Sequence, residues 1–334
     1  MRKFPLLMLF AAFVSGAFAA PEFKGSIERL DPGLDALIAP DAKIEVLCSG
    51  FTWSEGPVWH GGGIVFSDVP KNIAYQWKEG FEAAKEFLKP SGATKVLTDQ
   101  GSNGLANDAQ GRLILCQGGD RCVARLEENG RFTRLAEGYK GRHFNSPNDL
   151  IIHSNGTLVF TDPPYGVPKG GHQELDFHGV FVVTPHGQVL TLIKDVRFPN
   201  GIALSPDEKT LYIAVSDPER PRIIAYDYDP AARNEKGESI PGVTNERLFF
   251  DARPLVSPGR VGLPDGIKTD AGGNVWSTGP GGVQVFTKAG RLLGSILTGQ
   301  PTGNCAFGGN GSDFYITANM FLLRVKTKTK GMGF

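Results

Sequence analysis

The strongest constraint on the fold is a motif that occurs six times along the 334-residue chain. Each copy has a polar residue at its second or third position, called its anchor here, and continues through an apolar stretch, a turn rich in Gly or Asp and a second apolar stretch. The six copies read SEGPVWHGGGIVFSD, SNGLANDAQGRLILCQ, SPNDLIIHSNGTLVFTD, PNGIALSPDEKTLYIAV, PDGIKTDAGGNVWSTG and GNCAFGGNGSDFYITA. Their anchors are Glu55, Asn103, Asn148, Asn200, Asp265 and Asn304. The first and last anchors are five intervals apart, so the period is about fifty residues, as in the four-stranded blades of a β-propeller.

The segments between the anchors are typical of short strands joined by turns. The chain contains 44 Gly and 23 Pro, and tetrapeptides such as DAQG, HSNG and DAGG separate runs rich in Val, Ile, Leu and aromatic residues. No long amphipathic helical pattern interrupts them. We therefore predict an all-β fold, a single six-bladed β-propeller over residues 20–334, closed by strands from both ends of the chain.

The anchors of a propeller are expected to form a ring, because the innermost strand of every blade lines the central channel. This ring would combine the carboxylates of Glu55 and Asp265 with four Asn amides. Such oxygens suit Ca²⁺, which takes ~6–8 oxygen ligands, better than metals that prefer His or thiolate ligands. We predict one divalent cation in the channel, Ca²⁺ first, with Mg²⁺, Mn²⁺ or Zn²⁺ as alternatives. Asn-Gly and Asp-Gly are also common turn dipeptides, so only three or four anchors are expected to bind it.

Six segments in a fixed order add a specific resemblance: SEGPVW, NSPNDL, FTDPPYG, FPNGIALSPDEKTLYIA, LPDGIKTDAGGNVW and NCAFGG. From about Ile44 to Val325 the chain resembles the gluconolactonase, regucalcin (senescence marker protein) and luciferin-regenerating enzyme family, and within it the bacterial gluconolactonase branch. The resemblance implies a six-bladed propeller with one divalent metal ion in its channel, which agrees with the repeat count.

The resemblance also implies which residues hold the metal. Glu55, Asn200 and Asp265 would be ligands, and Asp265 would double as the general base. Asn148 would lie beside the metal, either as a further ligand or as a contact to substrate or to a metal-bound water.

Other implied roles concern the substrate. Asn103 is expected to contact it, and Asn304 has no defined role. Animal members of the family carry an arginine two residues before the channel asparagine, where this chain has Ser146, so the arginine contact is expected of Arg142. Tyr165, in the DPPYG loop, is interpreted as a packed loop aromatic rather than as part of the mouth.

These features predict a metal-dependent hydrolase that opens sugar lactones, with the cation polarising the lactone carbonyl and Asp265 taking a proton from water. A G-x-S-x-G nucleophile elbow does not occur, and the six histidines form no recognisable triad or zinc motif. His143, close to the NSPND segment, is interpreted as a solvated loop residue. Two alternatives stay open: an aryl- or phosphoester hydrolase on the same propeller, and a non-catalytic sugar-binding propeller. The two ring carboxylates argue against the second.

The first nineteen residues predict export. Arg2 and Lys3 precede the apolar run Phe4–Val14, and the pattern Ala17-Phe18-Ala19 is typical of a signal-peptide cleavage site. The run is too short to span a bilayer, so we expect a periplasmic or secreted protein with no membrane partner after cleavage. The 35 basic residues balance the 35 acidic ones, which gives no support to nucleic-acid binding.

Four cysteines, Cys48, Cys116, Cys122 and Cys305, leave the disulfide question open. An oxidising compartment permits disulfides, and Cys116 and Cys122 would face each other if QGGDR were the turn of a hairpin. Small buried thiols that never pair are an equally good interpretation.

Overall fold

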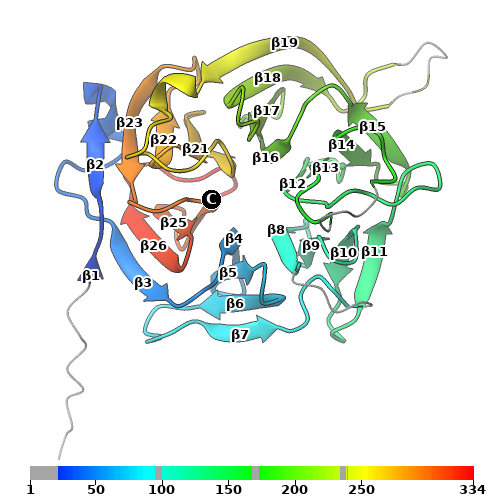
Figure 1. Cartoon of the computed structure of the whole chain (residues 1–334), viewed down its shortest axis with the longest axis horizontal. Helices are drawn as coiled ribbons and strands as arrows, with labels where there is room; N and C mark the ends of the chain where they lie inside the picture. Colours follow the sequence, from blue (N-terminus) through cyan, green and yellow to red (C-terminus); the bar gives the residue numbers. More distant parts are fainter. Residues whose placement is uncertain (1–21, 95–99, 168–172, 234–237, 239) are drawn as a thin grey trace, which may run out of the picture.

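The computed structural model describes residues 22–94, 100–167, 173–233, 238 and 240–334. In this part of the chain six antiparallel β-sheets are arranged around a common centre (Figure 1). The predicted six-bladed β-propeller is therefore confirmed. The described helices are the short 3-10 helices η1 (Pro32–Ala36) and η2 (Arg253–Leu255), and no helix among the described residues has the length and apolar character needed to cross a membrane. The predicted signal peptide, residues 1–19, lies outside the described residues.

Blades 1 to 4 each contain four strands that follow one another along the chain, with the first strand innermost. Blade 1 contains β4 (Ser54–His60), β5 (Gly63–Asp68), β6 (Ile73–Trp77) and β7 (Lys85–Leu88). Blade 2 contains β8 (Ser102–Asn107), β9 (Leu113–Gln117), β10 (Cys122–Leu126) and β11 (Phe132–Ala136). Blade 3 contains β12 (Leu150–Ile152), β13 (Leu158–Asp162), β14 (Gly179–Val183) and β15 (Val189–Ile193). Blade 4 contains β16 (Pro199–Leu204), β17 (Thr210–Val215), β18 (Arg222–Asp229) and β19 (Gly242–Asp251).

The N-terminal segment completes the last two blades. Blade 5 contains β20 (Ile267–Thr269), β21 (Val275–Gly279), β22 (Gly282–Phe286) and β23 (Leu292–Leu297), and β2 (Ser26–Arg29) pairs with β23. Blade 6 contains β24 (Asn304–Gly308), β25 (Asp313–Ala318) and β26 (Phe321–Lys326), followed outward by β3 (Glu45–Ser49) and β1 (Glu22–Phe23). Leu323 on β26 pairs with Val46 on β3. Strands from both chain ends thus close the ring, as predicted.

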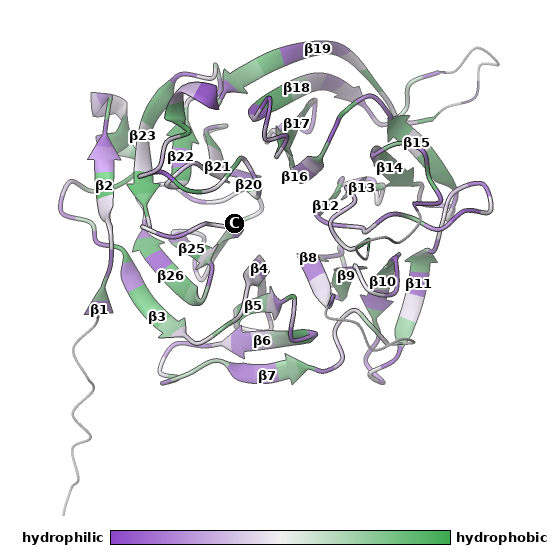
Figure 2. Ribbon diagram, in the orientation of Figure 1, coloured by the Kyte–Doolittle hydropathy of each residue, from purple (hydrophilic) through white to green (hydrophobic). Residues whose placement is uncertain are grey.

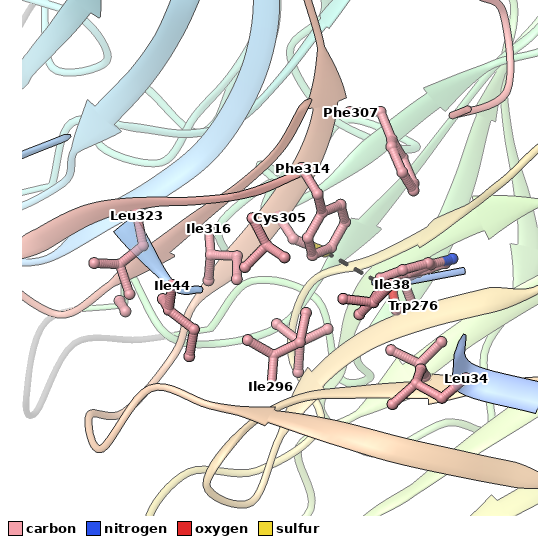
Figure 3. Close-up of a cluster of buried hydrophobic side chains, with 14 of the residues drawn as sticks. Leu34, Ile38, Ile44, Trp276, Ile296, Cys305, Phe307, Phe314, Ile316 and Leu323 are labelled. Atoms are coloured by element: carbon pink, nitrogen blue, oxygen red, sulfur yellow. Dashed lines mark hydrogen bonds between the residues drawn. The ribbon is translucent and has the colours of Figure 1, made fainter. Parts of the chain in front are cut away.

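Hydrophobic side chains fill the space between adjacent blades. Trp276 and Ile296 of blade 5 pack with Phe314 and Leu323 of blade 6, and Leu34 of η1 joins the same cluster (Figure 3). Hydrophobic stretches follow the strands, β14, β15 and β23 among them (Figure 2). A fully buried side chain of this size contributes roughly 1.5–3 kcal/mol through the area it removes from water. This packing holds neighbouring blades together and so fixes the width of the channel.

Candidate active site

A cavity of about 390 Å³ opens at one mouth of the channel and collects most of the anchors. Five of the six line it, namely Glu55, Asn103, Asn148, Asn200 and Asp265. The sixth, Asn304, is buried next to it, where its Nδ2 lies 3.4 Å from Oδ2 of Asp149. Residues spread over five blades and 210 positions of sequence therefore share one small space.

The inner strands place the anchors at this mouth. Glu55, Asn103 and Asn200 lie near the starts of β4, β8 and β16. Asn148 and Asp265 each come two residues before an inner strand, β12 and β20. Because Asn103 and Asn200 are strand residues, the Asn-Gly pairs that begin with them are not hairpin turns, and the turn interpretation of these dipeptides is wrong.

The glycine after an anchor lets the inner strands of adjacent blades approach each other. A Cβ at Gly56, whose φ is +51°, would lie 2.0 Å from the backbone oxygen of Asn103. A Cβ at Gly201 would lie 2.0 Å from the backbone oxygen of Asp265, to which Gly201 donates its N–H at 2.9 Å. Any larger residue would push the two anchors apart.

The two ring carboxyl groups both have raised pKa values. Glu55 is 2% exposed, and burial first, with a contribution from Asp149, raises the pKa of its carboxyl to about 7. Burial, followed by the charges of Glu55 and Asp149, raises the pKa of Asp265 well above its usual range. Two acids that resist ionisation in one cavity are the expected signature of a site built for a positive charge.

Unpartnered amide oxygens provide a direct test of whether a cation fits. The Oδ1 atoms of Asn103 and Asn200 are buried and have no hydrogen-bond partner. A buried acceptor without a partner costs about 1–3 kcal/mol, so it is rare unless a ligand satisfies it. Within the described residues no three His, Cys, Asp or Glu side chains form a metal cluster, so a cation here needs amide oxygens as well as carboxylates. The donor set, carboxylates and amides on one cavity, fits a hard divalent cation.

Two channel residues were missed by the sequence reasoning. Asp149, next to the anchor Asn148, is 2% exposed and adds a third carboxylate. Lys268, on β20, places its Nζ 3.5 Å from Oδ2 of Asp149, 3.4 Å from Oδ1 of Asn304 and 3.0 Å from the backbone oxygen of Ile267. Lys268 could have been found from the sequence, because it is a charged residue only three positions after an anchor, within a predicted inner strand.

Two aromatic residues also belong to the cavity wall. The ring of Tyr165 stacks on Phe198, with centroids 6.1 Å apart, as expected for a packed loop aromatic. The residue lines the cavity together with Ser216 and Asn200, however, so it does belong to the mouth. Trp53 lines the cavity too and donates its Nε1–H to Oε1 of Glu55 at 3.2 Å.

Arg142 and His143 lie away from the cavity. Arg142 is exposed, donates to the backbone oxygen of Glu174 at 3.2 Å and lies 3.9 Å from Asp176. His143 is exposed, as interpreted from the sequence, and its backbone N–H donates to Glu174. The structure therefore does not bring Arg142 together with the anchors.

No disulfide joins any of the four cysteines, all of which lie in the described part of the chain. Within the hairpin, Cys122 pairs with Gln117 and Cys116 with Val123, so the two sulfur atoms do not face each other. Burial raises the pKa of Cys48 and of Cys305 to about 12, which keeps these thiols in their unreactive protonated form. Of the two interpretations, small cysteines that form no disulfide describe this structure, with Cys116, Cys122 and Cys305 buried and Cys48 half-buried.

Comparison with known proteins gives the family. The SMP-30/Gluconolactonase/LRE-like region matches residues 53–320, which is most of the chain. The chain belongs to this family. A gluconolactonase of Zymomonas mobilis subsp. mobilis is 36% identical over 92% of the chain and 87% of its own length.

Solved structures of the family share the fold. A gluconolactonase of Xanthomonas campestris superposes with a TM-score of 0.78 at 32% identity, covering 93% of this chain and 99% of its own. A calcium-binding protein of Agrobacterium tumefaciens, regucalcin, superposes with a TM-score of 0.66 at 19% identity, covering 86% and 94%. The second likeness shows the common propeller fold.

Proposed function

We propose that this protein is a divalent-cation-dependent lactonase that opens sugar lactones such as gluconolactone. The observation that carries the proposal is the convergence of Glu55, Asn200 and Asp265 on one cavity, with carboxyl groups of raised pKa and an unpartnered amide oxygen. The gluconolactonases of Zymomonas mobilis and Xanthomonas campestris, both above 30% identical over nearly the whole chain, support the reaction class.

Glu55, Asn200 and Asp265 would hold the cation, with Asn148 beside them. When bound, the cation supplies Lewis-acid polarisation of the lactone carbonyl and stabilisation of the negative charge that develops on its oxygen. Ca²⁺ fits the all-oxygen donor set best.

The proton transfers are assigned to Asp265. One of its carboxylate oxygens takes a proton from the water that attacks the carbonyl carbon. The same carboxyl group returns this proton to the ring oxygen as the acyl–oxygen bond breaks, so the product is the open hydroxy acid.

Polar groups on the wall would orient the sugar. Asn103 and Asn148 line the cavity and offer amide donors and acceptors to the lactone hydroxyls. Lys268 forms an ion pair with Asp149, which offsets the negative charge that Asp149 adds beside the two cavity carboxylates. Trp53 and Tyr165 provide flat walls of the kind that pack against sugar rings.

Asp265→Ala tests the proposal. Proton release from gluconolactone, measured in a weakly buffered indicator assay with Ca²⁺, Mg²⁺, Mn²⁺ or Zn²⁺, is expected to fall by at least about 100-fold in kcat, because the base is lost. Asp227→Ala removes a half-exposed carboxylate on an outer strand of blade 4 and is the matched control. Treatment with a chelator is expected to stop turnover, and added cation to restore it.

Other outcomes are equally informative. Full turnover by a folded Asp265→Ala variant would contradict the assignment of the base. Turnover of aryl esters or phosphotriesters without turnover of any aldonolactone would replace the substrate class. Binding of sugar lactones with no turnover under any cation would contradict the enzyme.

We also propose that the chain is exported and cleaved near Ala19, so that it acts in the periplasm or outside the cell. The support is the sequence pattern of residues 1–19. Cell fractionation of an expressing bacterium, followed by mass measurement of the intact protein, tests this. A cytoplasmic protein that retains Met1–Ala19 would contradict it.

A further inference from the structure

The amide of Asn200 has one satisfied end and one unsatisfied end. Its Nδ2 donates to Oγ of Ser216 at 2.8 Å, whereas its Oδ1 is buried without a partner. Asn200 itself is 4% exposed and lines the cavity. The orientation of this amide decides whether an oxygen or an NH₂ group is presented to a cation, and only the oxygen can be a ligand.

Ser216 fixes that orientation through its own hydrogen bond. Its hydroxyl donates to the backbone oxygen of Pro264 at 2.5 Å. A carbonyl oxygen can only accept, so the single hydroxyl proton of Ser216 is committed to Pro264. What Ser216 offers Asn200 is therefore a lone pair, and Asn200 must turn its N–H toward Ser216 and its oxygen away from it.

The same hydroxyl ties together two blades. Ser216 directly follows β17 in blade 4, and Pro264 directly precedes Asp265, the ligand contributed by blade 5. One serine thus acts on Asn200 through its side chain and on Asp265 through the preceding backbone.

We propose that Ser216 is a positioning residue for the cation site, which orients the oxygen of Asn200 into the cavity and holds the backbone before Asp265. This inference rests on the proposed function, since it presumes that the cavity binds a cation. Residues that hydrogen-bond to a metal ligand and fix its orientation typically lower the metal affinity by roughly 10- to 100-fold when they are removed.

The test is cation affinity, measured by calorimetric titration of Ca²⁺ into chelator-treated protein. Ser216→Ala is expected to weaken binding about tenfold, because the amide is then free to turn. The matched control is Ser205→Ala at the opposite end of the same β16–β17 hairpin. Ser205 donates to Asp207 and accepts from the N–H of Thr210, so its loss removes two hydrogen bonds from the hairpin without touching the cavity. Its affinity is expected to equal that of the wild type.

A second background separates orientation from general loosening. In Asn200→Asp both terminal atoms are oxygens, so turning the side chain no longer changes the ligand. Ser216→Ala is therefore expected to cost much less affinity in this background than in the wild type, a coupling that a double-mutant cycle measures. An equal loss in both backgrounds would overturn the orientation mechanism.

If Ser216→Ala does not fold, the variants Ser216→Thr and Ser216→Val can be compared instead, because threonine and valine have the same shape. Threonine keeps the hydroxyl and is expected to keep the affinity, whereas valine has the same shape and is expected to lose it. Wild-type affinity in Ser216→Ala or Ser216→Val, alongside weakened binding in Asn200→Ala, would overturn the role of Ser216 and leave the proposed function intact. No Ca²⁺, Mg²⁺ or Mn²⁺ binding by the wild type would overturn both.

Discussion

Glu55 illustrates what a buried acid needs before it ionises. It receives an N–H from Gly56 at 3.1 Å and the indole N–H of Trp53 at 3.2 Å, and both stabilise the charged form. Burial and the nearby charge of Asp149 act in the other direction and dominate, so the pKa rises. A cation in the cavity would supply what the two N–H groups do not.

Because the pKa of Glu55 is raised, the unfolding free energy of the cation-free protein depends on pH. Glu55→Gln removes this dependence. The pKa of Glu55 is about 7 in the folded protein and 4.5 when unperturbed, so the folded state binds this proton more tightly than the unfolded state. The resulting stabilisation is complete below pH 4.5 and is lost as the pH rises through 7. Without cation, Glu55→Gln is therefore expected to match the wild type at about pH 4 and to exceed its unfolding free energy by about 1–3 kcal/mol at pH 8.

In saturating Ca²⁺ at pH 8 the wild type is instead expected to have the higher unfolding free energy. The reason is that the Glu55 carboxylate binds the cation strongly, whereas the amide of Glu55→Gln does not. Denaturant unfolding at both pH values, with Ca²⁺ and with chelator, measures the difference in unfolding free energy between Glu55→Gln and the wild type under each of these four conditions. Glu219→Gln, at an exposed carboxylate, is expected to change none of them. A pH-independent difference between Glu55→Gln and the wild type would contradict the burial of an ionisable Glu55.

The sequence revealed those site residues that recur once per blade. The motif marked all six anchors at or just before the start of an inner strand, and the resemblance then singled out Glu55, Asn200 and Asp265. Ser216 and Lys268 occur in single copies, and their partners come from other blades, so nothing in the local sequence showed which atoms they meet. Arg142 was assigned from the resemblance alone, and it is not part of the cavity wall.

At the scale of strands and loops, an aspartate at the end of the second strand holds the segment before the anchor. Asp68, the last residue of β5, accepts the backbone N–H groups of Thr52 and Trp53, just before Glu55. Asp162, the last residue of β13, accepts those of Asn145 and Ser146 at 2.8 and 2.6 Å, just before Asn148. In the sequence these aspartates recur in the segments VFSD and VFTD. The backbone N–H groups that they bind, however, depend on how the strands fold against each other and cannot be read from the segments themselves.

The contact between inner strands predicts a sharp effect of Gly201→Ala. The new Cβ would lie 2.0 Å from the backbone oxygen of Asp265, so blades 4 and 5 must separate locally. Overpacking of this kind costs about 1–3 kcal/mol, and the hydrogen bond between Gly201 and Asp265 is strained as well. We expect a lower unfolding free energy and weaker Ca²⁺ binding. Gly259→Ala, where nothing lies within 4 Å of the new Cβ, is the control; equal stability of the two variants would contradict the close contact.

For the whole molecule, the period of the motif was enough to predict the blade number and closure by both ends, because each blade repeats the same hydrophobic pattern. The extra strand on blade 5 was not predictable in the same way. β2 belongs to no repeat, and it pairs with β23 only because blades 5 and 6 lie next to the N-terminal segment once the ring has closed. Long-range pairing of this type follows from the closed shape, not from local pattern.

Ring closure depends on the seam between blade 6 and its neighbours, where Arg324 is the central residue. The Arg324 side chain on β26 is only 6% exposed and donates to Glu45 on the closing strand β3 at 2.9 Å and to Glu79 of blade 1 at 2.5 Å. Its guanidinium also lies 5.5 Å from the ring centroid of Trp77 in blade 1. One side chain therefore links the last blade to both the N-terminal strand and the first blade.

Arg324→Ala is expected to loosen this seam before any other part of the propeller. The change leaves Glu45 without its buried partner and removes the packing on Trp77. We expect it to lower the unfolding free energy by about 1–3 kcal/mol. This is less than the loss of a fully buried ion pair would cost, because both glutamates reach solvent. Hydrogen exchange should speed up in β3 and β26 and stay unchanged in blades 3 and 4. Arg247→Ala removes an exposed ion pair with Asp227 on the outside of blade 4 and should change neither quantity measurably. Uniformly faster exchange in all six blades of the Arg324→Ala variant would show that the ring opens as one unit and that the seam is not its weakest point.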